Sequence, residues 1–167
     1  IEAALQEHRI DLGLVEGICR LPNLRYTTFL QDELVAVVHT GSKLSLPDEI
    51  TPEDLSRIPL VLRERGSGTL DVFERALSEH NMKLSSLNVL LYLGSTESIK
   101  LFLEHTDCIG IVSIRSISRE LLSGTFRVIE IKGMPMLREF CFAQPQGQES
   151  GLSQVLMQFA MHHNKKL

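Results

Sequence analysis

Apolar runs alternate with amphipathic stretches along most of the chain. The runs are rich in Ile, Leu and Val, which is typical of strands buried on both faces. They cover residues 9–17, 24–41, 59–64, 87–94, 108–114, 126–131 and 137–144. The run over 24–41 contains a break near Gln31 and Asp32, so it predicts two extended segments.

The stretches between these runs carry apolar residues three and four positions apart, the spacing of amphipathic helices. They cover residues 1–5, 70–80, 95–105, 116–124 and 152–163. The last helix is expected to turn its apolar side chains inward, namely Leu152, Val155, Leu156 and Phe159. Strands that alternate with helices predict βαβ units, mainly parallel sheets and an α/β fold.

Two loops share one construction, in which a strand passes through glycine and hydroxyl residues into a helix. The first contains Ser67, Gly68 and Thr69, and the second contains Ser95 and Thr96. The first turn of a helix has unpaired N–H groups and a partial positive charge, which suit an anion. The two loops therefore predict an anion or carboxylate site. The alternative is that these residues only cap their helices, and the spacing fits both interpretations.

Composition restricts the possible functions. The chain has 167 residues, of which 43% are hydrophobic and 23% charged, as expected for a globular protein of one domain or two small lobes. Its net charge of −4 argues against a nucleic-acid-binding surface, which needs clustered Lys and Arg. No apolar run approaches the length of a membrane span.

Residues that could support catalysis or metal binding are scattered. Three cysteines without metal-ligand spacing suit a reducing compartment such as the cytoplasm. The histidines form no catalytic or metal motif, so we expect no enzyme activity, no metal and no cofactor. His39 and Glu16 could face a ligand, although a structural role is the alternative for each. The charged run from Arg63 to Arg65 is expected to be solvated.

The order of motifs resembles the effector-binding domain of LysR-type transcriptional regulators, a bacterial family. The matching phrases span nearly the whole chain in family order: IDLGLVEG, DELVAVVHTGSKL, ITPEDLSRIPLVLRERGSGT, LGSTESIK, IGIVSIRSISRELLSGTFRVIEI and LREFCFAQ.

The resemblance implies a two-lobed fold of the type II periplasmic-binding-protein class, joined by two crossing strands. One lobe would comprise residues 1–58 and 137–167, and the other residues 59–136. A small, anionic effector would bind in the cleft between the lobes, and a winged helix-turn-helix outside this chain would contact DNA. Homodimers, and tetramers of the full-length protein, are the usual assemblies of the family.

The resemblance also implies which residues contact the effector. They are Glu16, Gly17, His39, Ser67, Gly68, Thr69, Ser95, Thr96 and Ser113. The chain departs from the family pattern in two places. It begins within a helix, so the N-terminal strand of the first lobe is expected to be missing, and residues 107–111 differ from the usual Gly-Leu-Gly-Ile. A solute-binding module of a transport system with the same fold is the alternative function.

Overall fold

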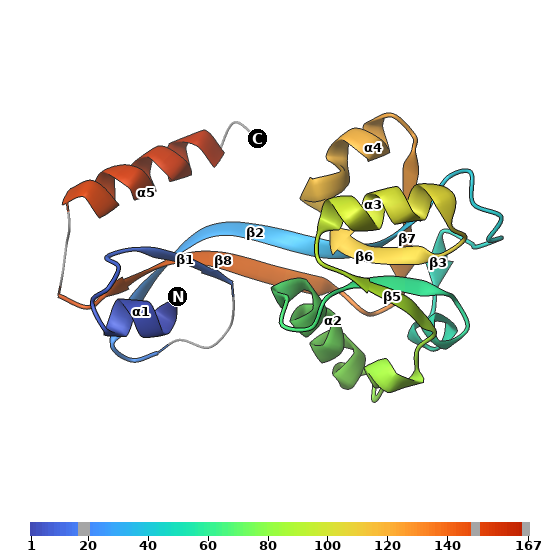
Figure 1. The fold of residues 1–167 in the computed structure, drawn as a ribbon, viewed down its shortest axis with the longest axis horizontal. Helices are drawn as coiled ribbons and strands as arrows, with labels where there is room; N and C mark the ends of the chain where they lie inside the picture. The colour runs from blue at the N-terminus through green and yellow to red at the C-terminus, as the bar shows by residue number, and fades with distance from the viewer. Residues whose placement is uncertain (17–20, 148–150, 165–167) are drawn as a thin grey trace. The chain divides into compact units, whose positions relative to one another are not determined.

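The computed structural model describes residues 1–16, 21–147 and 151–164, which divide into two compact units. Unit 1 comprises the described residues of Ile1–Gln31 and Arg138–Leu167, and unit 2 comprises Asp32–Leu137. Two long strands, β2 (Leu24–His39) and β8 (Met136–Pro145), run through both units (Figure 1).

Unit 2 contains most of the regular structure. Its strands are β3 (Glu49–Ile50), β4 (Leu60–Arg63), β5 (Val89–Leu93), β6 (Ile109–Ser113) and β7 (Phe126–Ile131). Its α-helices are α2 (Gly68–Glu79), α3 (Thr96–His105) and α4 (Ser118–Leu122). Short 3₁₀ helices are η1 (Pro52–Ser56), η2 (Leu84–Ser86) and η3 (Ile114–Ile117).

The sheet of unit 2 is mixed. Strand β4 pairs in parallel with β5 and with β6, whereas β2 pairs antiparallel with β6 and with β7. Strand β3 pairs in parallel with β7. Parallel strands joined through helices are the βαβ units that the alternating pattern predicted, so the α/β class with a mixed sheet is confirmed.

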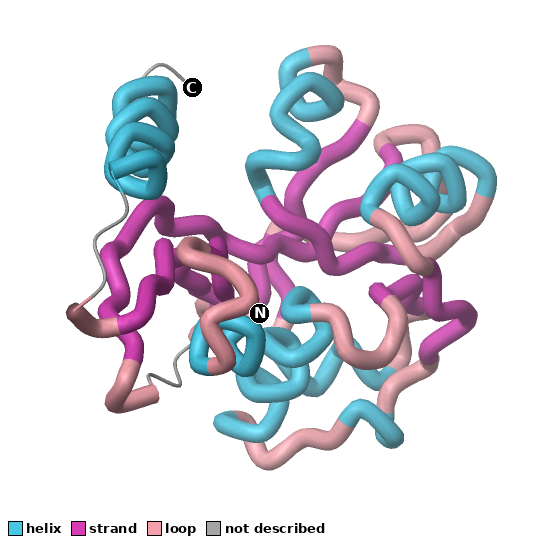
Figure 2. The backbone as a smooth tube through the Cα atoms, turned by 60° about the vertical axis from the view of Figure 1, so that its left-hand side comes forward, coloured by secondary structure: helices cyan, strands magenta, loops and turns pink. Residues whose placement is uncertain are grey.

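Helices cover both faces of this sheet (Figure 2), and each face has its own apolar core. Along β2, Leu34, Ala36 and Val38 join the core under α2, while Val37 joins the core under α3. Successive side chains of a strand point to opposite faces, so one strand supplies both cores. This explains why the strand runs in the sequence are continuously apolar instead of alternating.

The boundary between the units differs from the one expected at residue 58. The chain enters unit 2 at Asp32, because Leu34 to Val38 pair with β6 and because Leu55 of η1 is buried in the core under α2. The return at Arg138 lies within one residue of the expected position 137. The prediction of two extended segments with a break near Gln31 and Asp32 is wrong, because β2 is one continuous strand whose residues belong to both units.

Unit 1 contains α1 (Glu2–Gln6), β1 (Gly13–Glu16), α5 (Gly151–Asn164) and parts of β2 and β8. Strand β1 pairs antiparallel with β8, with Gly13 opposite Ala143. Leu5, Leu24 and Ala143 form a small core. No helix of the described residues is long and apolar enough to cross a membrane.

Helix α5 does not face as the sequence predicted. Its apolar stripe, formed by Leu152, Val155, Leu156 and Phe159, is exposed. The other side of the helix, with Gln154, Met157 and Met161, lines a hollow of about 180 Å³ together with Arg25 and Gln144. Helical spacing identifies an apolar stripe, but it does not specify which surface the stripe covers.

Candidate functional site

The loops after β4, β5 and β6 lie at one edge of the unit 2 sheet. Both β5 and β6 run parallel to β4, with Arg63 opposite Leu93 and Val61 opposite Gly110. The carboxyl ends of the three strands therefore coincide. In open α/β sheets this edge is where ligands bind.

The loop after β4 is fixed by backbone contacts before it enters α2. Glu64 N donates to Leu93 O at 3.1 Å, and Ser67 N donates to Glu64 O at 3.2 Å. Gly66 has a φ of +85°, a conformation that suits glycine. Ser67 Oγ then accepts from Leu70 N at 3.2 Å and caps α2. Next to it, Gly68 is half-buried and Thr69 is buried.

The loop after β5 repeats this geometry on α3. Ser95 Oγ accepts from Ser98 N at 3.1 Å and lies 2.8 Å from Ser98 Oγ. Thr96 is the first residue of α3 and is half-buried. The predicted capping role is thus confirmed for Ser67 and Ser95. A cap satisfies one N–H group, and the N–H groups of the first helical turn have no carbonyl partner within the helix.

Arg63 joins the two loops instead of standing in solvent. Its guanidinium donates to Glu64 at 2.8 Å and 3.0 Å and to Gly94 O at 3.4 Å, and its side chain is only 21% exposed. The hydrogen bond between the Arg63 guanidinium and the Glu64 carboxylate raises the pKa of Arg63 and lowers the pKa of Glu64. The expectation that the whole charged run is solvated is therefore wrong for Arg63.

Ser113 lies at the same edge, at the end of β6, and it is held by a buried acid. Its Oγ donates to Asp32 Oδ1 at 2.8 Å, and Asp32 is 5% exposed. Leu34 on β2 is directly opposite Ser113, which brings the start of that segment to this edge. Sequence reasoning missed Asp32. The available signal was an acid at the break between two apolar strand segments.

His39 lies at the opposite edge of the sheet. Because β2 and β6 are antiparallel, Leu34 faces Ser113 at one end and Val38 faces Ile109 at the other, with His39 one residue further. The His39 ring packs edge-on against Phe126 at 6.0 Å, and its Nδ1 accepts from Gly41 N at 3.2 Å. The structure therefore does not bring His39 together with the serine and threonine residues.

The remaining two predicted contacts belong to unit 1. Glu16 ends β1 and accepts a hydrogen bond from Arg138 Nη1 at 3.1 Å, and both side chains are largely buried. The Arg138 guanidinium also lies 4.8 Å from the centre of the Phe140 ring. Glu16 is thus held in an ion pair. Gly17 lies outside the described residues.

The edge of unit 2 is therefore a set of hydroxyl groups and helix N-termini. Hydroxyl and amide donors, with two helix dipoles directed at them, suit a carboxylate or phosphate ligand. The members of the set are Ser67, Gly68, Thr69, Ser95, Thr96 and Ser113.

Comparison with known proteins places the chain in a family. Residues 1–165 match the LysR substrate binding domain family. The uncharacterized HTH-type transcriptional regulator YeiE of Escherichia coli (strain K12) is 33% identical over 128 residues, covering 77% of this chain and 42% of that protein. The chain therefore spans less than half the length of this relative.

Solved structures show the same fold. The regulatory domain of CcmR from Synechocystis PCC6803, in complex with 2-PG, gives a TM-score of 0.81 at 24% identity, covering 99% of this chain and 79% of that one. The effector binding domain of QuiR, in complex with shikimate, gives 0.76 at 19% identity, covering 99% and 77%. At such identities the likeness concerns the fold alone. The family match over residues 1–165 shows that the chain belongs to the LysR substrate binding domain family, as the order of its motifs predicted.

Proposed function

We propose that the chain is the effector-sensing domain of a LysR-type transcriptional regulator and binds a small anionic metabolite. The site is the carboxyl edge of the unit 2 sheet. The observation that carries the proposal is that α2 and α3 both begin at this edge, each capped by a serine. Two positive helix ends in one place favour a negative ligand more than either end alone.

Two further observations support an anionic ligand at this edge. Thr69 and Thr96 follow the two caps, so their hydroxyls lie where the helices begin. Among the proteins that share this fold, the CcmR domain was solved with 2-PG and the QuiR domain with shikimate. The fold therefore accommodates small ligands in these two proteins.

The proposed role of the whole protein follows the relative that is described as a helix-turn-helix regulator. In this proposal the chain signals effector binding and does not catalyse a reaction. DNA is contacted by a separate winged helix-turn-helix domain, because the net charge of −4 on this chain does not favour binding to nucleic acid. The protein works in the cytoplasm as a homodimer or tetramer. Effector binding favours one arrangement of the two lobes over another, and this change alters DNA binding.

Replacing one capping serine with aspartate distinguishes a role in capping alone from a role in ligand binding. Asp is as good an N-cap as Ser, so Ser95→Asp should keep the stability of α3 while its charge repels an anion. We expect small carboxylates and phosphate esters, beginning with 2-PG and shikimate, to raise the melting temperature of the parent by mass action. The same ligands should not stabilise Ser95→Asp. Ser85→Asp, which adds the same charge on an exposed residue of η2, is the control.

Two threonine variants test the contacts individually. Thr69→Ala and Thr96→Ala should each weaken anion binding by about 1–3 kcal/mol, because an acceptor of the bound ligand then loses its partner. Isothermal titration calorimetry measures this change directly. Equal affinities in the parent, both threonine variants and Ser95→Asp would contradict the proposed site.

A further inference from the structure

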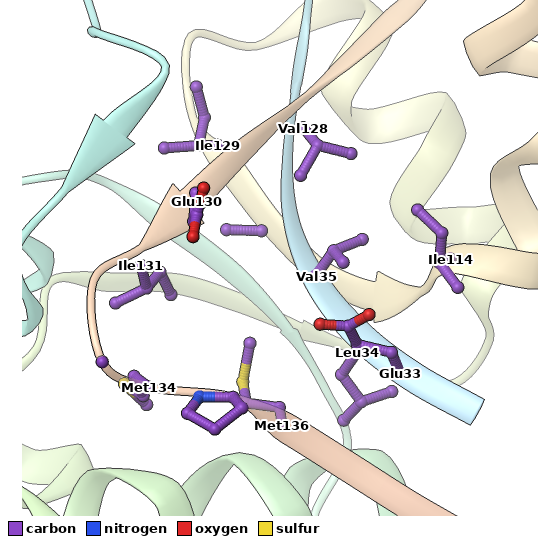
Figure 3. A pocket seen from close by; sticks show the side chains of 13 residues that line it. Glu33, Leu34, Val35, Ile114, Val128, Ile129, Glu130, Ile131, Met134 and Met136 are labelled. Atoms are coloured by element: carbon purple, nitrogen blue, oxygen red, sulfur yellow. The ribbon is translucent and has the colours of Figure 1, made fainter. Parts of the chain in front are cut away.

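A cavity of about 370 Å³ opens in unit 2 where two strands separate (Figure 3). Strands β2 and β7 are paired from His39 to Ala36, with Ala36 opposite Ile129. Beyond this point β7 turns to pair with β3, and Glu130 lies opposite Glu49. The cavity lies between residues 33–36 of β2 and residues 128–136.

The wall formed by residues 132–136 is firmly held. Lys132 N donates to Ile50 O at 2.9 Å, and Met134 N donates to Ile131 O at 3.1 Å. His80 Nε2 lies 3.0 Å from Gly133 O and fastens the turn to α2. Because these bonds define the turn, the cavity is a preformed feature of unit 2, as small-molecule sites usually are.

The lining combines apolar side chains with two carboxylates. Val35 and Ile114 lie on one side, and Met134 and Met136 on the other. Both methionines are almost fully buried, so they form the floor of the cavity. Methionine adapts its shape to irregular ligands. Glu33 and Glu130 contribute the acidic groups and are exposed.

These two carboxylates have no counter-ion within the described residues. The basic side chains nearest along β7 and its turn are engaged with other acids: Arg127 pairs with Asp48 at 3.1 Å, and Lys132 lies 3.9 Å from Glu49. The described residues also hold no group of three potential metal ligands. A cavity with two unneutralised carboxylates and an apolar floor therefore suits an organic cation better than a metal ion or an anion.

We propose that this cavity binds a small alkylammonium ion. Its charged group would lie between Glu33 and Glu130, and its hydrocarbon part against Val35, Ile114, Met134 and Met136. None of the residues of the proposed anion site lines the cavity. The inference is thus a second binding site of opposite charge preference, and it stands independently of the proposed function.

Titration with hexylammonium chloride tests the proposal on the whole 167-residue chain. Two-dimensional NMR should show shifts concentrated at residues 33–36 and 128–136, and 1-hexanol and hexanoate should bind at least tenfold more weakly. Glu33→Gln and Glu130→Gln should each weaken hexylammonium binding at least fivefold. Glu53→Gln, an exposed acid of η1, is the matched control and should bind as the parent does.

A substitution that fills the cavity provides a second test, because it leaves the carboxylates of Glu33 and Glu130 in place. Val35→Phe should abolish binding, and if that variant does not fold, the two glutamine variants still decide the matter. Equal binding of hexylammonium and 1-hexanol would overturn the cation preference. Unchanged affinity in both glutamine variants, or shifts centred on residues 63–69 and 94–96, would overturn the site itself.

Discussion

Ser113 donates a 2.8 Å hydrogen bond to Asp32, a carboxylate that is buried where the chain enters unit 2. The two residues are distant in the sequence, and the antiparallel pairing of β2 with β6 brings them together. A hydroxyl on the predicted ligand edge is thus oriented by the first residue of the unit. The Asp32 side chain, which was not among the predicted site residues, is part of the structural support of this edge.

Removing the Ser113 hydroxyl should destabilise the protein. Ser113→Ala leaves a buried carboxylate with one hydrogen bond fewer, which should lower the free energy of unfolding by about 1–3 kcal/mol. Urea denaturation measures this change. Ser118→Ala, which removes an exposed hydroxyl at the start of α4, should change stability by less than about 0.5 kcal/mol. Equal effects in the two variants would show that the Asp32 contact does not contribute.

Gly110 is required for the close packing of α3 on β6. A Cβ atom at this position would lie 2.9 Å from Ile99 Cγ2 and 3.1 Å from Leu103 Cδ1, both fully buried side chains. Gly110→Ala should therefore reduce stability by about 1–3 kcal/mol through overpacking. A Cβ atom at Gly94 would have no neighbour within 4 Å, so Gly94→Ala should be neutral or slightly stabilising. Thermal unfolding compares the two variants. A melting temperature of Gly110→Ala equal to that of the parent would contradict the packing argument.

Lys100 connects α3 to α4 and gives the protein an acid-sensitive contact. Its Nζ lies 2.5 Å from Glu120 and 2.9 Å from Glu97. Burial alone would lower the pKa of Lys100, but hydrogen bonds to Glu120 and Glu97 outweigh it and raise the pKa. The hydrogen bond from Lys100 lowers the pKa of Glu120 below its usual 4.5.

The pH dependence follows from the sign of that shift. A carboxyl whose pKa is lower in the folded state stabilises the fold above pH 4.5, and the stabilisation is lost as the pH falls through the folded value. Glu120→Gln should cost about 1 kcal/mol at pH 7 and nothing well below pH 4. Unfolding free energies measured across this range test the difference. Glu104→Gln, an exposed acid on α3, is the control, and a pH-independent difference for Glu120→Gln would refute the assignment.

Cys108 should be unreactive in the folded protein. Burial, with a smaller contribution from Asp107, raises the pKa of its thiol to about 11. Because the thiolate is the reactive form, iodoacetamide at pH 8 should leave Cys108 unmodified in the native protein and modify it fully in guanidinium. Peptide mass spectrometry distinguishes it from the other cysteines. Native labelling at the rate of an exposed thiol would contradict this burial.

The order of strands and helices could be predicted because it depends on local patterns. Continuous apolar runs specified β4, β5 and β6, and the serine caps specified where α2 and α3 begin. Each signal acts within a few residues, through side-chain periodicity or a cap hydrogen bond. Ser67 and Ser95 were therefore identified correctly as caps, and the motif order led to the correct family.

The features that the sequence left undecided depend on partners distant in the sequence. The apolar stripe of α5 was visible in the sequence, but only the fold shows that its other side faces β2 and β8. His39 ends an apolar strand, as predicted, and the antiparallel direction of β2 places it at the far edge from Ser113.

By itself, the sequence determined most strand and helix segments, the helix caps and the family, since these depend on residues that are neighbours along the chain; the exceptions are β2, which is one strand where two segments were predicted, and β3, which was not predicted. Only the tertiary structure decided which ends of the strands coincide, that Asp32 supports Ser113, and that a cavity opens where β7 leaves β2. These relationships come from strand direction and register, which are set by long-range pairing.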